Sequence, residues 1–175
     1  MKKIILCLIV MGMSVGAFAQ NNEFGVVIGG FNGLSYKRIV SEKFAIQTDL
    51  GVGFQRSIVD ILGDSELYSM QGDWFDFVLN PNFLYNKELS HGIYAFVGGG
   101  ASVGLAQVMH TSIETVTYGK FGLNGMLGAG YKMSKLPLSF ALDFRPGYAM
   151  LLNVEWETLL HTFDWHLAAS VRYCF

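Results

Sequence analysis

The chain has 175 residues, of which 51% are hydrophobic, 14% aromatic and only 15% charged. A soluble secreted β-barrel such as a lipocalin needs a charged exterior, so this composition argues against one. The formal net charge of −2 argues against nucleic-acid binding and gives no sign of a polybasic membrane tether. The length leaves room for one domain.

Residues 1–19 have the pattern of a cleaved secretory signal peptide. Lys2 and Lys3 precede the apolar run Ile4–Phe18, which closes on the small-x-small sequence Ala17-Phe18-Ala19. A transmembrane anchor is the competing interpretation, but the run is shorter than the roughly 20 residues that a spanning helix needs. Cleavage after Ala19 would leave a mature barrel domain of residues 20–175.

Cysteine usage adds little chemistry. Cys7 lies near the start of the apolar run, too early for a lipoprotein attachment site, and it is removed with the signal peptide. Cys174 then stands alone, so we expect no intrachain disulfide and no metal framework. We predict no cofactor.

Two strands are predicted near the start of the mature chain, Glu23–Phe31 and Leu34–Val40. Asn32-Gly33 between them is a strong signal for a two-residue hairpin turn. This hairpin is short, so we expect the barrel wall to be lowest beside it.

Five later segments have an apolar residue at nearly every second position, with mostly polar, small or charged residues between, which predicts strands with one apolar face. They are Phe44–Gln55, Phe75–Tyr85, Phe121–Tyr131, Leu138–Tyr148 and Trp165–Phe175. Their apolar faces contain no charged residue, and Thr48 is the only polar one. High hydrophobicity in alternating segments, without a spanning helix, is typical of a transmembrane β-barrel.

The last strand shows the alternation most clearly. Its apolar face is Phe163, Trp165, Leu167, Ala169, Val171, Tyr173 and Phe175. Its other face is Thr162, Asp164, His166, Ala168, Ser170, Arg172 and Cys174. The ending on Phe175 resembles the terminal strand of Gram-negative outer-membrane barrels, where a final Phe belongs to the insertion signal.

The apolar face of each of the five strands ends ten residues from where it starts. At about 3.3 Å per residue and a tilt near 45°, ten steps rise roughly 24 Å, close to the apolar band of such barrels. Aromatic residues at these ends predict a girdle at each membrane interface. The girdle residues are Phe44, Phe54, Phe75, Tyr85, Phe121, Tyr131, Tyr148, Trp165, Tyr173 and Phe175.

One more segment completes the count. Ile93–Gln107 is a strand of ambiguous facing with a glycine run at Gly98-Gly99-Gly100. Bacterial single-chain barrels have an even number of strands, and the segments above add up to eight. The predicted fold is all-β, an eight-stranded antiparallel up-and-down transmembrane β-barrel in the outer membrane.

The connections predict an orientation. Short ones at Val40–Lys43, Asn86–His91 and Ser134–Pro137 should be periplasmic turns, and long ones at Arg56–Asp73, Val108–Tyr118 and Met150–Leu160 should be extracellular loops. Pro81 lies mid-strand, where proline has no backbone N–H to donate to the neighbouring strand, and this predicts a bulge or local distortion. Pro146 lies nearer the outer rim and should matter less.

The sequence also resembles a known family, the small outer-membrane protein β-barrels of Bacteroidota, within the OmpA/OmpX-like eight-stranded barrels. The residues of the resemblance are Gly33-Leu34-Ser35-Tyr36-Lys37-Arg38, Phe44-Ala45-Ile46, the Ala19-Gln20 junction, Gly98-Gly99-Gly100 and the aromatic terminus. The resemblance covers the whole mature chain. It implies the barrel fold and the outer membrane, and it implies no particular activity.

Polar residues on the inner faces predict a plugged lumen. The predicted network is Asp49, Asp76, Asp143, Arg145, Asp164, His166 and Arg172, with Lys37, Lys120 and Lys132 as further cations and Gln47, Asn80, Asn82 and Asn124 as amides. Opposite charges inside a closed wall should pair, because an unpaired buried charge is costly. The inward glycines Gly51, Gly53, Gly122, Gly128 and Gly130 either leave space for a solute or make room for Tyr94 and Phe96; we favour the second.

Three functions stay open. We favour a non-enzymatic structural or interaction role; a narrow channel or carrier for small or apolar solutes is the alternative. A lipid A deacylase or acyltransferase is less favoured, because it needs a nucleophile beside a base. Candidates for that chemistry are His161, His166, Ser170, Asp164, Glu155 and Glu157, whereas His110 reads as a solvated loop residue.

The predicted outer segments are unusually apolar, notably Met150–Trp156 and the group Ile58, Val59, Ile61 and Leu62. We favour strands that simply extend beyond the bilayer over a protein or lipid partner bound at the outer rim. Outer-membrane lipid is the expected surrounding, and no nucleic-acid partner is expected.

Overall fold

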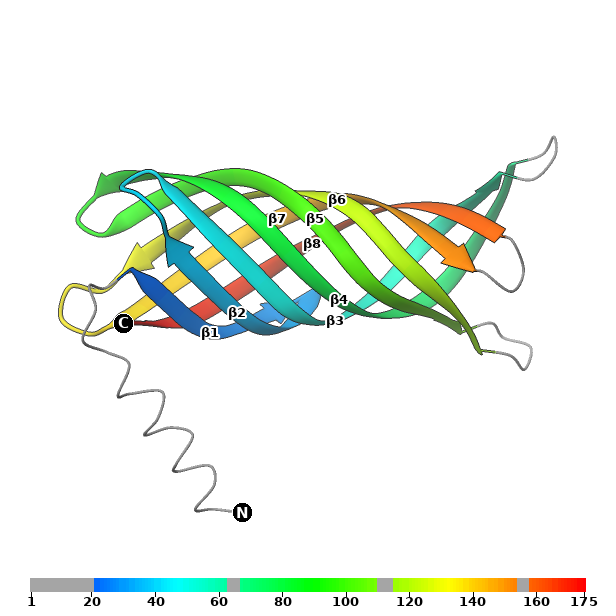
Figure 1. The fold of residues 1–175 in the computed structure, drawn as a ribbon, viewed down its shortest axis with the longest axis horizontal. Helices are drawn as coiled ribbons and strands as arrows, with labels where there is room; N and C mark the ends of the chain where they lie inside the picture. The colour runs from blue at the N-terminus through cyan, green and yellow to red at the C-terminus, as the bar shows by residue number, and fades with distance from the viewer. Residues whose placement is uncertain (1–20, 63–66, 110–114, 154–157) are drawn as a thin grey trace, which may run out of the picture.

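Eight antiparallel strands form one closed barrel (Figure 1). The computed structural model describes residues 21–62, 67–109, 115–153 and 158–175, so the predicted signal peptide lies outside the described residues. The strands are β1 Asn22–Gly29, β2 Phe31–Ile39, β3 Phe44–Leu62, β4 Leu67–Ser90, β5 Ile93–Met109, β6 Thr115–Lys132, β7 Leu138–Asn153 and β8 Thr158–Cys174. The predicted all-β barrel of eight strands is confirmed. In these ranges no helix is long and apolar enough to cross a membrane.

The barrel is apolar outside and polar inside. Along β7 buried and exposed residues alternate almost without exception. The outward residues Leu123 and Leu142 are 72% and 68% exposed, whereas the inward Asp49 and Arg172 are 0% and 1% exposed. Large apolar side chains over the whole outer wall are stable against lipid rather than water.

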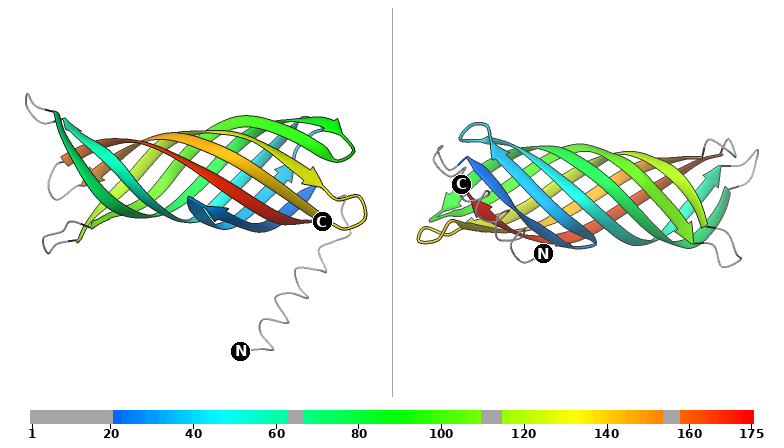
Figure 2. Two further views of the ribbon diagram at one scale, coloured as in Figure 1. Left: turned by 180° about the vertical axis from the view of Figure 1, so that it is seen from behind. Right: turned by 60° about the horizontal axis from the view of Figure 1, so that its bottom comes forward.

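The last strand closes the barrel onto the first. β8 pairs with β1 from Glu23↔Cys174 to Gly29↔Ala168, and with β7 along nearly its whole length. Asn22 and Phe175 exchange two backbone hydrogen bonds of 3.0 and 2.8 Å. Both ends of the described chain therefore lie at one end of the barrel, the terminal end, and the opposite end is the distal end (Figure 2).

The turn of the first hairpin differs from the prediction. Asn32-Gly33 lies within β2, where Gly33 pairs with Gly51, and the turn is formed at Gly29-Gly30 instead. Gly29 has φ of 146°, which a side chain would disfavour. Asn32 closes the turn from the side, accepting a hydrogen bond from Gly29 N and donating one to Gly29 O.

The distal connections are much shorter than predicted. β3 and β4 stay paired to Leu62↔Leu67, so strand replaces most of the predicted loop Arg56–Asp73. The predicted loops Val108–Tyr118 and Met150–Leu160 shorten in the same way, since β5–β6 pairing reaches Met109↔Thr115 and β7–β8 pairing reaches Asn153↔Thr158. These hairpins extend past the short β1–β2 hairpin (Figure 1). Beyond that low point β3 pairs directly with β8 at Asp60↔His161.

Two of the three predicted turns at the terminal end are confirmed. β2 ends and β3 begins around Val40–Lys43, and residues 133–137, which include Ser134–Pro137, join β6 to β7. The turn predicted at Asn86–His91 is shorter than predicted, because β4 continues to Ser90. His91 and Gly92, with φ of 43° and 84°, form the tight turn, as primed hairpin turns require.

Neither proline shifts the strand register. β4 pairs with β5 at Leu79↔Val103 and again at Asn82↔Gly100, so there is no bulge at Pro81, but the pairs between these two points are missing from the ladder, which is the local distortion that the sequence predicted as the other possibility. The prediction that Pro146 matters less is wrong, because the β6–β7 ladder has the same gap between Asn124↔Gly147 and Leu127↔Phe144. Each proline removes a donor without inserting a residue. The β4–β5 register shifts instead between Glu88 and Ser90.

Two of the five predicted glycines, Gly128 and Gly130 on β6, make room for the aromatic rings of β5. The prediction is wrong for Gly51, Gly53 and Gly122, where a Cβ would meet Asn32, Asp76 and Tyr148 respectively. A Cβ at Gly128 would lie 2.4 Å from Phe96 Cζ, and one at Gly130 would lie 2.4 Å from Tyr94 Cζ. Phe96 is consequently buried in the lumen, and the two rings lie 6.0 Å apart. Shape complementarity between neighbouring strands thus fills this part of the barrel.

We expect Gly128→Val to destabilise the barrel by about 1–3 kcal/mol, because overpacking displaces Phe96 and the neighbouring backbone. The matched control is Ala129→Val, one residue along and facing outward. The measurement is the urea midpoint of unfolding in detergent, followed by the heat-dependent gel shift of a folded barrel. Equal midpoints for the two variants would contradict this packing.

Candidate functional site

Arg145 is held by two aspartates in the lumen, and this Arg145 cluster consists of Arg145, Asp49 and Asp143. Arg145 Nη1 donates to Asp49 Oδ2 at 2.6 Å, Nε donates to Asp143 Oδ1, and Nη2 reaches Asp143 Oδ2 at 3.3 Å. Gln47 donates to both carboxylate oxygens of Asp49 at 2.9 and 3.2 Å. The guanidinium is thus bidentate toward Asp143, which is the stronger arrangement.

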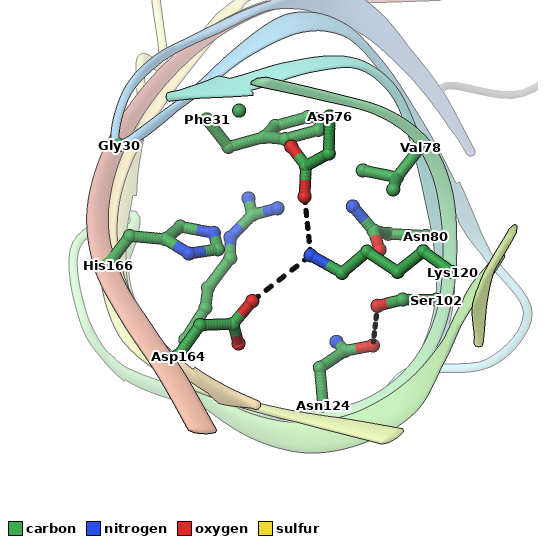
Figure 3. A pocket seen from close by; sticks show the side chains of 12 residues that line it. Gly30, Phe31, Asp76, Val78, Asn80, Ser102, Lys120, Asn124, Asp164 and His166 are labelled. Carbon is green, nitrogen blue, oxygen red and sulfur yellow. Dashed lines mark hydrogen bonds and ion pairs between the residues drawn. The ribbon is translucent and has the colours of Figure 1, made fainter. Parts of the chain in front are cut away.

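Lys120 occupies the centre of a second group, the Lys120 cluster of Lys120, Asp76 and Asp164 (Figure 3). Lys120 Nζ donates to Asp76 Oδ2 and, at 3.1 Å, to Asp164 Oδ2. The three residues come from β6, β4 and β8, so the Lys120 ammonium group links three different strands across the lumen. All three side chains are at most 10% exposed.

Amide side chains fill the space beside the two clusters. Asn124 donates to Asn82, Ser102 donates to Asn124 at 3.1 Å, and Asn82 donates to the backbone oxygen of Asn80 at 2.9 Å. These bonds cross from β4 to β6 on the inner side of the wall where the proline leaves a gap in the β4–β5 ladder. Side-chain hydrogen bonds therefore connect strands where the backbone ladder is interrupted.

Three groups of buried apolar residues, called layers here, accompany the polar clusters in the lumen. The distal layer is Ala106, Leu151 and Leu160, with Tyr118 packed against it. The middle layer is Val27, Phe31, Val78 and Ala168. The terminal layer is Ala45, Leu84, Phe96, Met126 and Ala141, with Tyr94 packed against it.

The order of these groups follows from single strands. Along β8 toward the terminal end come Leu160, Asp164 and Ala168, which places the Lys120 cluster between the distal and middle layers. Along β7 toward the distal end come Ala141 and then Asp143 and Arg145, so the Arg145 cluster lies on the distal side of the terminal layer. The Arg145 cluster also contacts the middle layer, since Asp143 pairs with Ala168 and the Arg145 guanidinium lies 5.9 Å from the Phe31 ring.

The space left between the layers is small. A cavity of about 30 Å³ lies beside Lys120, Asp164 and His166 and is the one drawn in Figure 3. A water molecule needs roughly 10–15 Å³ of such volume, so this cavity admits one or two waters. A larger hollow, the mouth cavity of about 170 Å³, lies at the terminal end between Glu23, Lys37 and Tyr94.

The other predicted lumen cations have different partners. Lys37 donates to Asn86 Oδ1 at 3.2 Å and lies 4.7 Å from the Tyr94 ring centre. Arg172 Nε donates to Ser35 Oγ at 2.9 Å, while its Nη2 has no hydrogen-bond partner among the described residues. Lys132 lines the mouth cavity. Of the predicted lumen cations, Arg145 and Lys120 are therefore the two that pair with the predicted aspartates: Arg145 with Asp49 and Asp143, and Lys120 with Asp76 and Asp164.

Sequence reasoning missed two inward residues near the first hairpin. Glu23 is 2% exposed and accepts a hydrogen bond from Ser139 Oγ at 3.0 Å. Phe31 is equally buried, belongs to the middle layer and lies 5.9 Å from the Arg145 guanidinium. The alternation of Glu23 with Phe24 was a usable signal, whereas the inward ring of Phe31 depends on where the turn falls.

The residues considered for catalysis do not converge. Asp164 is bound by Lys120, and His166 stacks with Phe31 at 6.3 Å instead. Within the described chain His166 Nε2 and Ser170 Oγ have no hydrogen-bond partner. His161 bonds to the hydroxyl of Tyr148 at 2.9 Å, away from the lumen. Glu155, Glu157 and His110 lie outside the described residues.

The apolar segment that begins at Met150 is strand up to Asn153. Met150 and Leu152 are exposed while Leu151 is buried in the distal layer, so the alternation of β7 continues. Strand extension, the favoured interpretation, accounts for these residues. Ile58–Leu62 belong to β3, and Val154–Trp156 lie outside the described residues.

The predicted girdle residues lie on the outer wall. Phe54, Trp165 and Tyr148 are 64%, 60% and 51% exposed. Phe44 contacts Phe83 and Tyr85, with ring centres 5.3 and 5.6 Å away. The remaining girdle residues are exposed or half-buried, namely Phe75, Phe121, Tyr131, Tyr173 and Phe175.

Comparison with known proteins places the fold. No protein-family model matches the chain, and no curated protein matches its sequence. Neisserial surface protein A has a TM-score of 0.56 at 15% identity, over 88% of this chain and 93% of that one. The N-terminal β-barrel domain of Pseudomonas aeruginosa OprF has a TM-score of 0.52 at 12% identity, over 89% and 98%. A major outer membrane protein from Thermus thermophilus has a TM-score of 0.49 at 11% identity, over 88% and 99%.

At these identities the first two similarities show the fold alone. The chain has the architecture of small eight-stranded membrane barrels. The predicted resemblance to the Bacteroidota family stays a prediction.

We expect Arg145→Met to lower the free energy of unfolding by about 3–5 kcal/mol, because it leaves two buried aspartates without their cation. Arg38→Met is the control, since Arg38 is exposed at the terminal end. Combining Arg145→Met with Asp49→Asn and Asp143→Asn should restore much of the loss. A single variant as stable as the wild type in urea unfolding would show that the cluster is dispensable.

Proposed function

We propose that the chain is an integral outer-membrane barrel with a sealed lumen and a non-enzymatic, structural or interaction role. The terminal end would face the periplasm, and the distal hairpins would extend outside the cell. The outward apolar wall, the architecture and the predicted signal peptide support this placement.

The observation that supports a sealed lumen is the stack of ion clusters and apolar layers. Each cluster links strands on different sides of the lumen, and the cavity beside Lys120 has room for only one or two waters. Eight-stranded barrels have interiors just wide enough for side chains to fill. A solute would have to break a buried ion pair at two successive levels.

A narrow cation path is the second candidate. Each cluster places two carboxylates beside one cation, so each level has a formal excess of one negative charge. Rings of carboxylates favour cations in membrane pores. This excess negative charge would select cations only if the side chains of the apolar layers moved apart to open a path.

We expect wild-type protein to give no steady single-channel conductance in planar bilayers, because both ion clusters and all three layers block the axis. Phe31→Ala combined with Lys120→Ala removes part of the middle layer and one cluster cation, and it should also stay silent, because the Arg145 cluster and the distal and terminal layers still block the axis. Phe77→Ala, an outward change on β4, is the control and should stay silent.

Folding of each protein is verified by its heat-dependent gel shift before recording. Steady conductance of the wild type would overturn the sealed lumen. If that conductance were cation-selective, the narrow path would replace it as the favoured function.

A further inference from the structure

The mouth cavity at the terminal end is large enough for a small organic molecule. Its volume of about 170 Å³ is more than ten times the roughly 10–15 Å³ that one water needs. Tyr94 lines the cavity and packs against the terminal layer. The Lys37 ammonium group lies 4.7 Å from the Tyr94 ring centre and 5.4 Å from that of Phe96. The terminal layer therefore closes the cavity on the side of the ion clusters.

Two buried opposite charges in the inner part of the cavity bond to neutral side chains. Glu23 and Lys37 are neighbours in the β1–β2 register and are 2% and 3% exposed. Glu23 accepts a hydrogen bond from Ser139 at 3.0 Å, and Lys37 donates one to Asn86 at 3.2 Å. An ammonium group has three N–H donors, so Lys37 can also donate to a ligand in the cavity.

Two further buried donors at this level lack an acceptor. Among the described residues the Tyr94 hydroxyl and Arg172 Nη2 have no hydrogen-bond partner. Arg172 lies close to the cavity, because it bonds to Ser35, two residues from Lys37 on the inner face of β2. Lys37, Arg172 and Glu23 together leave a formal excess of one positive charge. An acceptor with a single negative charge, such as a carboxylate, would satisfy these donors.

The rim of the cavity has the opposite excess. Glu42 and Glu88 line the rim and are exposed, and Lys132 beside them is half-buried. The rim thus has a formal excess of one negative charge, and its carboxylates can accept from an ammonium group. β2 passes Lys37 before the chain reaches the turn at Glu42, so the positive excess lies deeper than the negative one. All charged lining residues of the described chain enter this balance.

We propose that the mouth cavity binds a small α-amino acid as its zwitterion, with the carboxylate at Lys37 and Tyr94 and the ammonium group at Glu42 and Glu88. A quaternary ammonium ligand fits less well, because the Tyr94 ring that could face it already faces Lys37. A phosphate monoester fits less well than a carboxylate, because it would bring close to two negative charges beside Glu23. The inference goes beyond the proposed function and depends on neither the membrane placement nor the sealed lumen.

Isothermal titration calorimetry of the detergent-purified full-length protein tests the proposal, with L-alanine as the probe. Propionate lacks the ammonium group of L-alanine and ethylamine lacks its carboxylate, so these two compounds separate zwitterion binding from binding of either charge alone. The wild type should bind one L-alanine, and each of the other two should bind at least tenfold more weakly. No binding of L-alanine would overturn the proposal, and so would propionate or ethylamine binding as tightly.

Tyr94→Phe tests the inner contact, because it removes a hydroxyl without a partner in the described chain and leaves the ring in place. It should leave the stability of the barrel unchanged and weaken L-alanine binding about tenfold, the loss of one hydrogen bond to a carboxylate. Tyr36→Phe is the control, since its exposed hydroxyl bonds to Asn22 on the outer wall, and it should change binding less than twofold. Equal affinities of the two variants would contradict the assigned carboxylate position.

Glu42→Gln combined with Glu88→Gln tests the rim. This double variant should weaken L-alanine binding about fivefold and lose most of the preference over propionate, because the ammonium group loses two exposed ionic partners. Lys43→Gln combined with Lys87→Gln is the control, since these exposed lysines adjoin the glutamates in sequence but do not line the cavity, and it should change binding less than twofold. An equal loss in both double variants would overturn the rim contact. Heat-dependent gel migration verifies folding, and the conductance experiment would be unaffected by any of these results.

Discussion

In a closed ring of strands every residue faces either the surroundings or the lumen, and the two-residue repeat of the strand fixes which. In the described strands most outward positions are apolar, and the inward positions hold Asp49, Asp76, Asp143 and Asp164 together with amides and the cations Lys120, Arg145 and Arg172. A shift of one residue in β7 would put Asp143 and Arg145 into lipid and Phe144 into the lumen. The free-energy cost of moving these charges into lipid fixes the register of the strand. The register in turn decides which charged residues meet inside the lumen.

Once the register is set, the interior has to satisfy its own polar groups. Arg145 and Lys120 each take two aspartates from different strands, so the clusters act as cross-links through the lumen as well as charge neutralisers. The cavity beside them has room for only one or two waters, and such a low-dielectric surrounding strengthens each ion pair. Glycines on β6 opposite Tyr94 and Phe96 complete the filling at the terminal end. Rigidity and closure thus follow from the same side chains.

The sequence predicted the number of strands and the facing of the five alternating ones, because alternation is a local property, whereas the facing of Ile93–Gln107 stayed ambiguous. The inward facing of Asp49, Asp76, Asp143 and Asp164 could be predicted in the same way. Their partners could not, because the stagger between strands decides that Lys120 on β6 reaches Asp164 on β8. The same applies to Phe31, whose inward ring depends on a turn at Gly29-Gly30 that competed with the stronger local signal of Asn32-Gly33. Loop lengths were overestimated because polar residues in the distal hairpins hid the continued pairing of β3 with β4.

The central claim is that one face of each strand meets lipid and the other a sealed interior. A nitroxide scan along β7 in lipid vesicles tests it most directly, with Cys174 replaced by Ser and single cysteines placed from Ser139 to Met150. The account predicts that even-numbered positions are accessible to oxygen dissolved in the bilayer, and that odd-numbered positions are shielded from both oxygen and a water-soluble nickel chelate. Odd-numbered positions open to the nickel chelate, or accessibility without a two-residue period, would contradict it.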